Sequence, residues 1–159
     1  MYLENLKTPE DIKKLNIDEL KALSEEVREV IIETVKLNGG HLASNLGIVE
    51  LTIALFYVFD FPKDKLIFDV GHQSYAYKIL TNRFNQIKTI RKENGLSGFP
   101  DPTESEYDAF SVGHAGTSIS AGLGYAYSRD KLNEDYHVIN LVGDASIFNG
   151  ENLEAVTSK

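Results

Sequence analysis

Residues Ile139 to Val156, INLVGDASIFNGENLEAV, begin as a short apolar run, turn at Gly143-Asp144, and continue with a helical pattern. A second apolar run, Leu66 to Val70, stops in the same way at Gly71-His72. Short apolar strands that lead through a glycine turn into a helix are typical of α/β domains, in which helices flank a mainly parallel sheet. We therefore predict this fold class.

Helical patterns fill much of the remaining chain. Apolar residues recur at three- and four-residue spacing from Asp18 to Asn38, which predicts a helix with Asp18 as its N-cap and Gly39-Gly40 at its end. Residues Ile48 to Phe59 lie in the most apolar stretch, which contains an acid and is shorter than the roughly 18 residues of a membrane span, so we expect a buried helix. Further predictions are a short helix at Ser74 to Leu80, an irregular connection at Glu93 to Glu106, a helix in SISAGLGYAYSRD whose small residues let it lie close to a sheet, and a strand at His137 to Val142.

Composition excludes several classes of function. Asp and Glu outnumber Lys and Arg 24 to 16, which gives a net charge of −8 and disfavours nucleic acid or an anionic membrane as a partner. The chain has no cysteine, so disulfides, thiolate metal sites and a cysteine nucleophile are excluded. The N-terminal sequence MYLENLKTPEDIKKLNIDEL has no apolar signal core and is not free of acids, which predicts a cytoplasmic location.

Three turns combine glycine with a polar side chain: Gly71-His72, Gly113-His114 and Gly143-Asp144. Glycine lets the backbone approach a ligand closely, and the N–H groups at the start of a following helix favour a phosphate group. An acid at such a turn would repel phosphate unless a cation lies between them, so Asp144 indicates Mg²⁺. Two alternatives stay open here: Asp144 as an N-cap of the next helix, and the histidines as structural residues.

Several blocks in the same order resemble the amino-terminal part of the 1-deoxy-D-xylulose-5-phosphate synthase family, within the transketolase-like superfamily. These blocks are GGHLASNLGIVELTIAL, LIFDVGHQSYAYKILT, GLSGFP, SEYDAFSVGHAGTSISAGLG and VGDASIFNGENLEA. The resemblance implies a transferase that uses thiamine diphosphate and Mg²⁺. It implies that pyruvate loses CO₂ and that the remaining two-carbon unit is joined to D-glyceraldehyde 3-phosphate. The product of this condensation feeds isoprenoid, thiamine and pyridoxal synthesis.

The resemblance also implies cofactor-binding residues. His72 matches a histidine that reaches the cofactor near its diphosphate and reacting end, where an imidazole can also shuttle a proton. Gly113-His114-Ala115 matches a cofactor-contacting turn. Asp144 matches the Mg²⁺ ligand, and Ala145-Ser146 matches the backbone beside the diphosphate.

Residues that face the substrate follow from the same resemblance. His41 matches a histidine that faces the substrate, where it stabilises a developing alkoxide or binds the hydroxyl of the aldehyde. It is therefore, with His72, a predicted catalytic residue. Ser44 and Tyr75 are expected to help line the substrate cleft.

Two alanines depart from the family pattern. Ala145 stands where the family commonly has glycine. Alanine fits here only if the backbone at this position does not need a positive φ. Ala115 stands where the family has serine, and we expect the backbone N–H of Gly116 to be free to donate in place of the missing hydroxyl.

The resemblance predicts that residues 1–159 are part of the diphosphate-binding domain, with residues 1–17 as a lead-in, an incomplete sheet, and no pyrimidine-binding or C-terminal domain. A chain of this extent is expected to be inactive alone and to need the remainder of the synthase or a completing partner, with a homodimer as the complete form. Two alternatives stay open: a transketolase-type enzyme that transfers a ketol unit without loss of CO₂, and a non-catalytic interaction domain that retained the fold.

Overall fold

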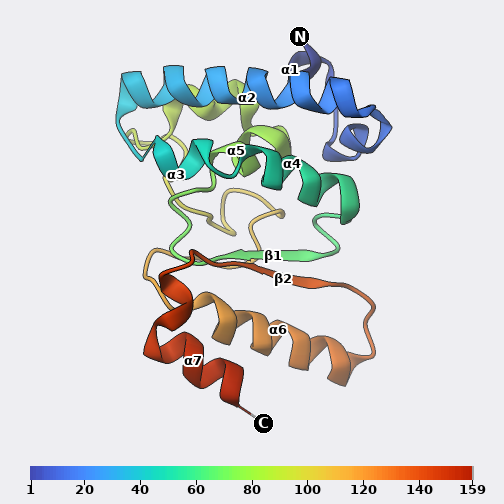
Figure 1. The fold of residues 1–159 in the computed structure, drawn as a ribbon, viewed down its shortest axis with the longest axis vertical. Helices are drawn as coiled ribbons and strands as arrows, with labels where there is room; N and C mark the ends of the chain where they lie inside the picture. Colours follow the sequence, from blue (N-terminus) through green and yellow to red (C-terminus); the bar gives the residue numbers. More distant parts are fainter. Residues whose placement is uncertain (159) are drawn as a thin grey trace. The chain divides into compact units, whose positions relative to one another are not determined.

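The computed structural model describes residues 1–158, which cluster into two compact units. The first unit contains Met1–Asp60 and His72–Gly98, and the second contains Phe61–Gly71 and the described residues from Phe99 onward. The chain passes from one unit to the other directly after Asp60, Gly71 and Gly98. The course of the chain can be followed by colour in Figure 1.

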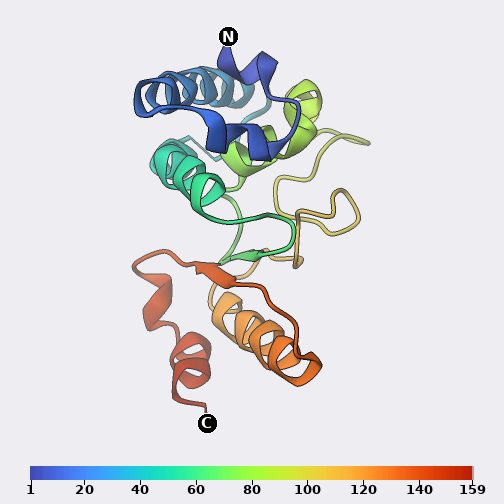
Figure 2. The same ribbon diagram turned by 90° about the vertical axis from the view of Figure 1, so that its right-hand side faces the viewer.

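The first unit is helical. Its elements are α1 (Tyr2–Asn5), the 3₁₀ helix η1 (Pro9–Lys14), α2 (Ile17–Asn38), α3 (Ala43–Leu46), α4 (Val49–Val58), α5 (Tyr75–Lys78), the π-helical turn η2 (Ile79–Arg83) and the 3₁₀ helix η3 (Phe84–Thr89). The long helix α2 contacts α1, α3, α4, α5 and η3, as Figures 1 and 2 show from two sides. The predicted lead-in belongs to this unit, because Leu3 and Ile12 are buried in it.

Helix α2 begins at Ile17, and its N-cap is Asn16, two residues before the predicted cap. The Asn16 side chain accepts hydrogen bonds from the backbone N–H groups of Asp18 and Glu19, and the Glu19 carboxylate accepts the Asn16 N–H at 2.8 Å. The prediction of Asp18 as N-cap is therefore wrong, because the Asn16/Glu19 spacing forms a reciprocal capping box. The predicted end is confirmed at Gly39, whose φ is +72°.

Helix α4 confirms the prediction for residues 48–59 to within one residue at each end, but only one side of it is buried. The buried side chains are Val49, Thr52, Ile53 and Phe56. The exposed large apolar side chains are Leu51, Tyr57 and Val58. The expectation of a buried helix is thus confirmed for the side of α4 that packs against α2, α5 and η1, and not for the side that carries the exposed residues. None of the helices within residues 1–158 has both the length and the apolar character needed to cross a bilayer.

The second unit contains the sheet. Strands β1 (Lys65–Phe68) and β2 (Val138–Leu141) pair in parallel, with Leu66 opposite Ile139 and Phe68 opposite Leu141. Helix α6 (Ser118–Leu132) lies against one face of this pair, followed after β2 by the 3₁₀ helix η4 (Ser146–Phe148) and by α7 (Gly150–Thr157), which packs beside α6 (Figure 2). Both strands and their parallel direction confirm the predicted α/β class.

Helix α6 approaches the sheet as closely as its small residues predict. A Cβ added to Gly122 would lie 2.3 Å from Nδ2 of Asn140 in β2, so a larger residue there would displace the Asn140 side chain. The connection from Glu93 to Glu106 contains turns and bends but neither helix nor strand, which confirms the prediction for this segment.

Candidate functional site

The predicted site residues divide between the two units. The first unit holds His41, Ser44, His72 and Tyr75, and the second holds Gly113, His114, Ala115, Asp144, Ala145 and Ser146. In each unit, one buried polar side chain that the sequence reasoning did not assign connects the segments that carry these residues. The two buried residues are Asn45 in the first unit and Asp69 in the second.

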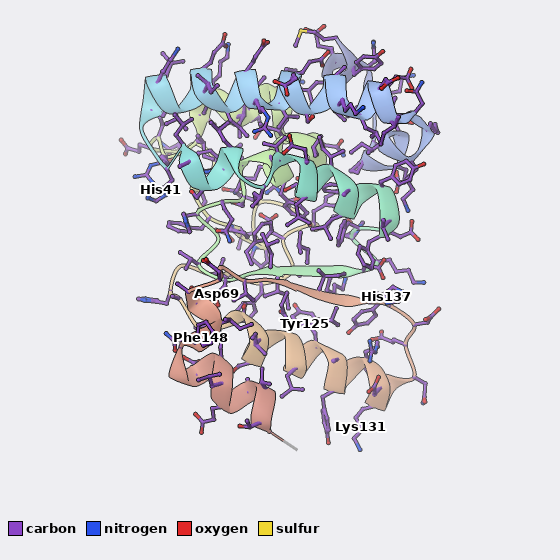
Figure 3. All side chains as sticks on the ribbon, viewed as in Figure 1. His41, Asp69, Tyr125, Lys131, His137 and Phe148 are labelled. Carbon is purple, nitrogen blue, oxygen red and sulfur yellow. The ribbon has the colours of Figure 1, made fainter. Side chains whose placement is uncertain are left out.

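His41 and His72 form a contact pair in the first unit. His41 lies on the segment before α3 and is exposed (Figure 3), while His72 is half-buried at the point where the chain enters this unit. The ring centroids are 5.6 Å apart and the rings are nearly perpendicular, at 87°. Burial, followed by the charge of His41, lowers the pKa of His72 below its usual value, which favours a neutral imidazole.

The Nδ1 atom of His72 is buried and has no hydrogen-bond partner among residues 1–158. Buried ring nitrogens of this kind normally have a partner, so an unsatisfied one is a position at which a bound group would gain a hydrogen bond. A neutral imidazole can accept a proton or a hydrogen bond on one nitrogen and donate from the other. This chemistry fits the predicted contact of His72 with a cofactor or a reacting group.

Asn45 in α3 connects the segments of both histidines. Its Nδ2 donates to the carbonyl oxygen of His41 at 2.5 Å and to that of His72 at 2.9 Å. Its Oδ1 accepts the backbone N–H of Tyr75 at 2.9 Å, and the side chain is fully buried. The amide therefore joins three points of the chain, two of which are the backbones of the predicted catalytic residues.

The other two predicted residues of this group differ in exposure. Ser44 is half-buried, whereas Tyr75 is completely buried. The Tyr75 hydroxyl would lie 2.6 Å from a Cβ added to Gly40, whose φ is +139°. Burial raises the pKa of Tyr75 against the opposing charge of Arg91, so the phenol stays protonated. A role of either side chain in lining a substrate cleft stays a prediction.

Asp69 organises the second unit directly after β1 (Figure 3). The residue is only 1% exposed, and its carboxylate accepts the Gly116 N–H at 3.0 Å, the Ser118 N–H at 3.3 Å and the Ser118 hydroxyl at 2.9 Å. Burial raises the pKa of Asp69, but the hydrogen bonds from Gly116, Ser118 and the Ser146 hydroxyl outweigh it, and the net shift is downward. The ionised carboxylate thus connects the loop after Ala115 with the turn after Asp144.

The turn that follows Asp69 is conformationally demanding. Val70 and Gly71 both have positive φ, +62° and +86°, and the Gly71 N–H donates to the Asp69 carbonyl oxygen at 2.7 Å. A Cβ on Gly71 would lie 2.4 Å from the Val112 side chain and 2.6 Å from that of Pro100. A positive φ at a β-branched residue is sterically costly, and such conformations concentrate at functional sites. The predicted Gly71-His72 turn therefore has a structural requirement for glycine.

A cleft of about 570 Å³ opens beside the Gly113-His114-Ala115 turn. Its lining residues are Phe110, Ser111, Val112, Gly113, His114, Thr117, Ser120, Ala121 and Glu151. The volume lies within the range of small-molecule sites. The Gly116 N–H, however, already donates to Asp69, so the expectation that this N–H is free to replace the hydroxyl missing at Ala115 is wrong.

The Asp144 turn is exposed and follows β2. The Asp144 Oδ1 accepts the Ala145 N–H at 2.8 Å, and Ala145 has φ −72°, which confirms that this position does not need a positive φ. Asn149, rather than Asp144, is the N-cap of α7, since its side chain accepts the Glu151 N–H. The next helix along the chain, η4, has Ala145 as its N-cap and no side-chain cap hydrogen bond, so the alternative that Asp144 caps the following helix is excluded.

Asp144 fits Mg²⁺ as a single ligand. Within residues 1–158, no three His, Cys, Asp or Glu side chains are grouped to hold a metal by themselves. Magnesium commonly takes one or two carboxylates and completes its octahedron with phosphate oxygens and water. The exposed Asp144 carboxylate can supply one such oxygen ligand.

Comparison with known proteins identifies the family. The family model described as 1-deoxy-D-xylulose-5-phosphate synthase matches residues 3–159. The synthase of Dictyoglomus turgidum is 57% identical over 156 residues, and that of Carboxydothermus hydrogenoformans is 58% identical over 154 residues. The chain belongs to the 1-deoxy-D-xylulose-5-phosphate synthase family.

The match covers nearly all of this chain but a minor part of the synthases. It spans 98% of the chain and 25% of the Dictyoglomus protein, and 97% of the chain and 25% of the Carboxydothermus protein. The structure of transketolase from Campylobacter jejuni is similar with a TM-score of 0.78 over 89% of this chain and 26% of that one, at 21% identity. That likeness supports the transketolase-like fold of this synthase family member.

Asn45 and Asp69 stand within sequence blocks typical of the synthase family, yet sequence reasoning assigned neither. Asp69 carried a usable signal, because an acid directly after the buried strand Leu66–Phe68 needs hydrogen-bond donors to compensate its burial. Asn45 carried none, since one asparagine between Ser44 and Leu46 does not reveal which carbonyl groups will face it.

Proposed function

We propose that this chain forms part of the cofactor-binding region of an enzyme that condenses pyruvate with D-glyceraldehyde 3-phosphate, with loss of CO₂, to give 1-deoxy-D-xylulose 5-phosphate. The observation that carries the proposal is the 57–58% identity to two synthases across nearly the whole chain. The proposal includes thiamine diphosphate and Mg²⁺ as cofactors, a homodimer as the complete form, and a cytoplasmic location.

The second-unit residues are proposed to bind the diphosphate end of the cofactor. Asp144 would hold Mg²⁺, and the backbone of Ala145-Ser146 would lie beside the diphosphate. The Gly113-His114-Ala115 turn, which opens onto the cleft, would contact the cofactor. Thiamine diphosphate itself supplies the carbanion chemistry when bound, and the chain supplies placement and charge.

The two histidines are proposed to act on the reacting groups. His72 is held mainly neutral and has an unsatisfied buried Nδ1, so it can accept a hydrogen bond or a proton from the cofactor or the donor substrate. The exposed His41, next to it, would stabilise a developing alkoxide or bind the hydroxyl of the aldehyde.

The test uses the full-length protein that contains this segment, with thiamine diphosphate, Mg²⁺, carboxyl-labelled pyruvate and D-glyceraldehyde 3-phosphate. Release of labelled CO₂ together with formation of 1-deoxy-D-xylulose 5-phosphate supports the proposal. Ketol transfer without release of CO₂ would indicate a transketolase-type enzyme instead.

A binding experiment separates the synthase from a non-catalytic domain of the same fold. Asp144→Ala should weaken Mg²⁺-dependent binding of thiamine diphosphate by at least about tenfold in calorimetry. Asp18→Ala, which removes an exposed acid on α2, is the matched control and should bind like the unmodified protein. Equal binding by both variants would overturn the role of Asp144.

A further inference from the structure

The Asn45 amide is surrounded by backbone groups that define its orientation. Two carbonyl oxygens, those of His41 and His72, face its Nδ2, and one N–H, that of Tyr75, faces its Oδ1. A flipped amide would place an oxygen against two carbonyl oxygens and an NH₂ against an N–H, so only the observed orientation satisfies all three groups.

No other residue of similar size provides this set of contacts. The position needs two donors and one acceptor on a short, planar head, and asparagine has all three. Aspartate has no donor, serine has one hydroxyl that cannot reach three points, and alanine has neither donor nor acceptor. The position is fully buried, so water can replace a missing donor only where the substitution leaves a space large enough for it.

These bonds bridge segments that are far apart in sequence. The residues joined to Asn45 at His72 and Tyr75 lie 27 and 30 positions away, while His41 is four positions away. The two imidazoles project from the bridged backbones and meet at a ring-centroid distance of 5.6 Å. Removal of the Asn45 side chain removes these hydrogen bonds between the His41 segment and the His72 segment.

We infer that Asn45 is a positioning residue that holds His41 and His72 at their contact distance. The catalytic meaning of this pair rests on the proposed function, but the bridge itself does not. Loss of the amide is expected to loosen the pair, and a misplacement of about 1 Å is sufficient to lower the rate of a positioned reaction by about 100-fold.

The test is a double-mutant cycle in the full-length protein, with ¹³C-labelled histidine and NMR titration. His41→Gln removes the charge that, after burial, most lowers the pKa of His72, so this pKa should rise. In an Asn45→Ala background the same substitution should raise the pKa of His72 by about half as much or less, because the rings are no longer held together. The His72 signal is assigned by its loss in His72→Gln.

Asn38→Ala is the matched control. The Asn38 Nδ2 also bridges two backbone carbonyl oxygens, those of Lys88 and Ile90, each at 3.0 Å, but neither belongs to a histidine segment. The effect of His41→Gln should persist in the Asn38→Ala background. An equal effect in the Asn45→Ala and Asn38→Ala backgrounds would overturn the inference.

Asn45→Ser guards against loss of folding in Asn45→Ala. Serine is uncharged and leaves one hydroxyl at this position, but it cannot bridge the His41 and His72 carbonyl oxygens and the Tyr75 N–H together, so the coupling of the histidines should again decrease. Undiminished coupling in the folded Asn45→Ser variant would overturn the inference just as it would in Asn45→Ala.

Kinetics separate the inference from the proposed function. If both are correct, Asn45→Ala lowers kcat by about 10- to 100-fold, while the Kd for thiamine diphosphate changes little. Reduced coupling with unchanged kcat would leave Asn45 as the bridge and refute the catalytic role of the histidines. Undiminished coupling would refute the bridge, whatever the activity.

Discussion

The two units each hold predicted site residues together through one buried polar side chain, but the two side chains differ in charge. Asp69 in the second unit is an ionised carboxylate that accepts from Gly116, Ser118 and Ser146. Asn45 in the first unit is a neutral amide that both donates and accepts. A carboxylate can accept from several donors at once, whereas an amide requires a defined mixture of donors and acceptors.

This difference matches what each unit has to arrange. The loops around Asp69 present backbone N–H groups, and only a strong acceptor satisfies several of them in a buried position. The segments around Asn45 present two carbonyl oxygens and one N–H, so a charge of either sign would leave at least one group unsatisfied. We expect the carboxylate to contribute more to stability and the amide more to the geometry of the histidines.

The largest expected effect is the loss of the carboxylate. Asp69→Ala should lower the free energy of unfolding by about 3–5 kcal/mol, because the N–H groups of Gly116 and Ser118 and the Ser118 hydroxyl lose a charged acceptor inside the protein. Asn45→Ala should lower it by about 2–3 kcal/mol, since its three partners are uncharged backbone groups. Urea unfolding of both variants measures the difference.

Asp144→Ala is the control for the loss of an acid, because Asp144 is exposed and accepts only a local N–H. Its effect should stay within about 0.5 kcal/mol. If Asn45→Ala lowers the free energy of unfolding as much as Asp69→Ala does, the charge of Asp69 does not make its hydrogen bonds more stabilising than those of Asn45.

The next effect concerns the glycines beside each group. Gly116→Ala in the second unit would place a Cβ 2.5 Å from the Asn149 side chain at φ +91°, and Gly40→Ala in the first would place one 2.6 Å from the Tyr75 hydroxyl at φ +139°. Each should lower the free energy of unfolding by about 1–3 kcal/mol. Thermal unfolding is the measurement, and the unfolding enthalpy converts each change in Tm to a free energy.

Gly113→Ala is the matched glycine control. A Cβ there meets no atom within 4 Å and Gly113 does not have a positive φ, so stability should change little. Gly116→Ala should in addition disturb the cap that Asn149 provides for α7 and raise amide exchange in that helix. Equal exchange in α7 for both variants would contradict this coupling.

Periodicity predicted the elements of the fold, while side-chain contacts across long sequence separations were beyond it. The strands at 66–70 and 137–142 and the helix beginning near Asp18 follow from local patterns of apolar residues, so they could be predicted. The cap of α2 was misassigned because Asn16 and Asp18 are both good N-caps, and only the reciprocal bond from Glu19 decides between them.

The types of residue in the site could be predicted, but the hydrogen bonds that hold the site segments together could not. The Gly-His and Gly-Asp pairs pointed to the turns that follow β1 and β2, since these dipeptides end apolar runs. The sequence indicates that Asp69 needs hydrogen-bond donors, but it does not indicate that Gly116, 47 positions away, is one of them. The same contact explains why the N–H of Gly116 was wrongly expected to be free.

Acid distinguishes the two residues, because Asp69 titrates and Asn45 does not. The pKa of Asp69 is lowered in the folded state, so its stabilising contribution is complete above the unfolded-state value of about 4 and decreases as pH falls through the folded value. The stability difference between the unmodified protein and Asp69→Asn should therefore be constant from pH 6 to 5 and shrink below about pH 4.

The Asn45 amide does not gain or lose charge in this pH range. In a His72→Gln background, which removes the titration of the coupled histidine, the stability difference caused by Asn45→Ala should stay constant over the same acid interval, measured by urea unfolding at each pH. A decrease parallel to that of Asp69→Asn would mean that the amide acts through a nearby carboxylate, and the comparison between a charged and a neutral residue would fail.

The smallest expected effect is the pH dependence that His72 brings to the first unit. Burial, then the charge of His41, lowers its pKa in the folded state, so the unfolded chain binds the proton more readily. The contribution of His72 to stability is therefore complete above its unfolded-state pKa of about 6.5 and is lost as pH falls towards its lower folded-state pKa.

His72→Gln should flatten the profile of unfolding free energy against pH in this interval, and His114→Gln controls for the loss of an exposed histidine. A profile that stays as steep in His72→Gln as in His114→Gln would show that His72 titrates alike in the folded and unfolded chain, and the neutral imidazole assigned to the pair would have to be abandoned.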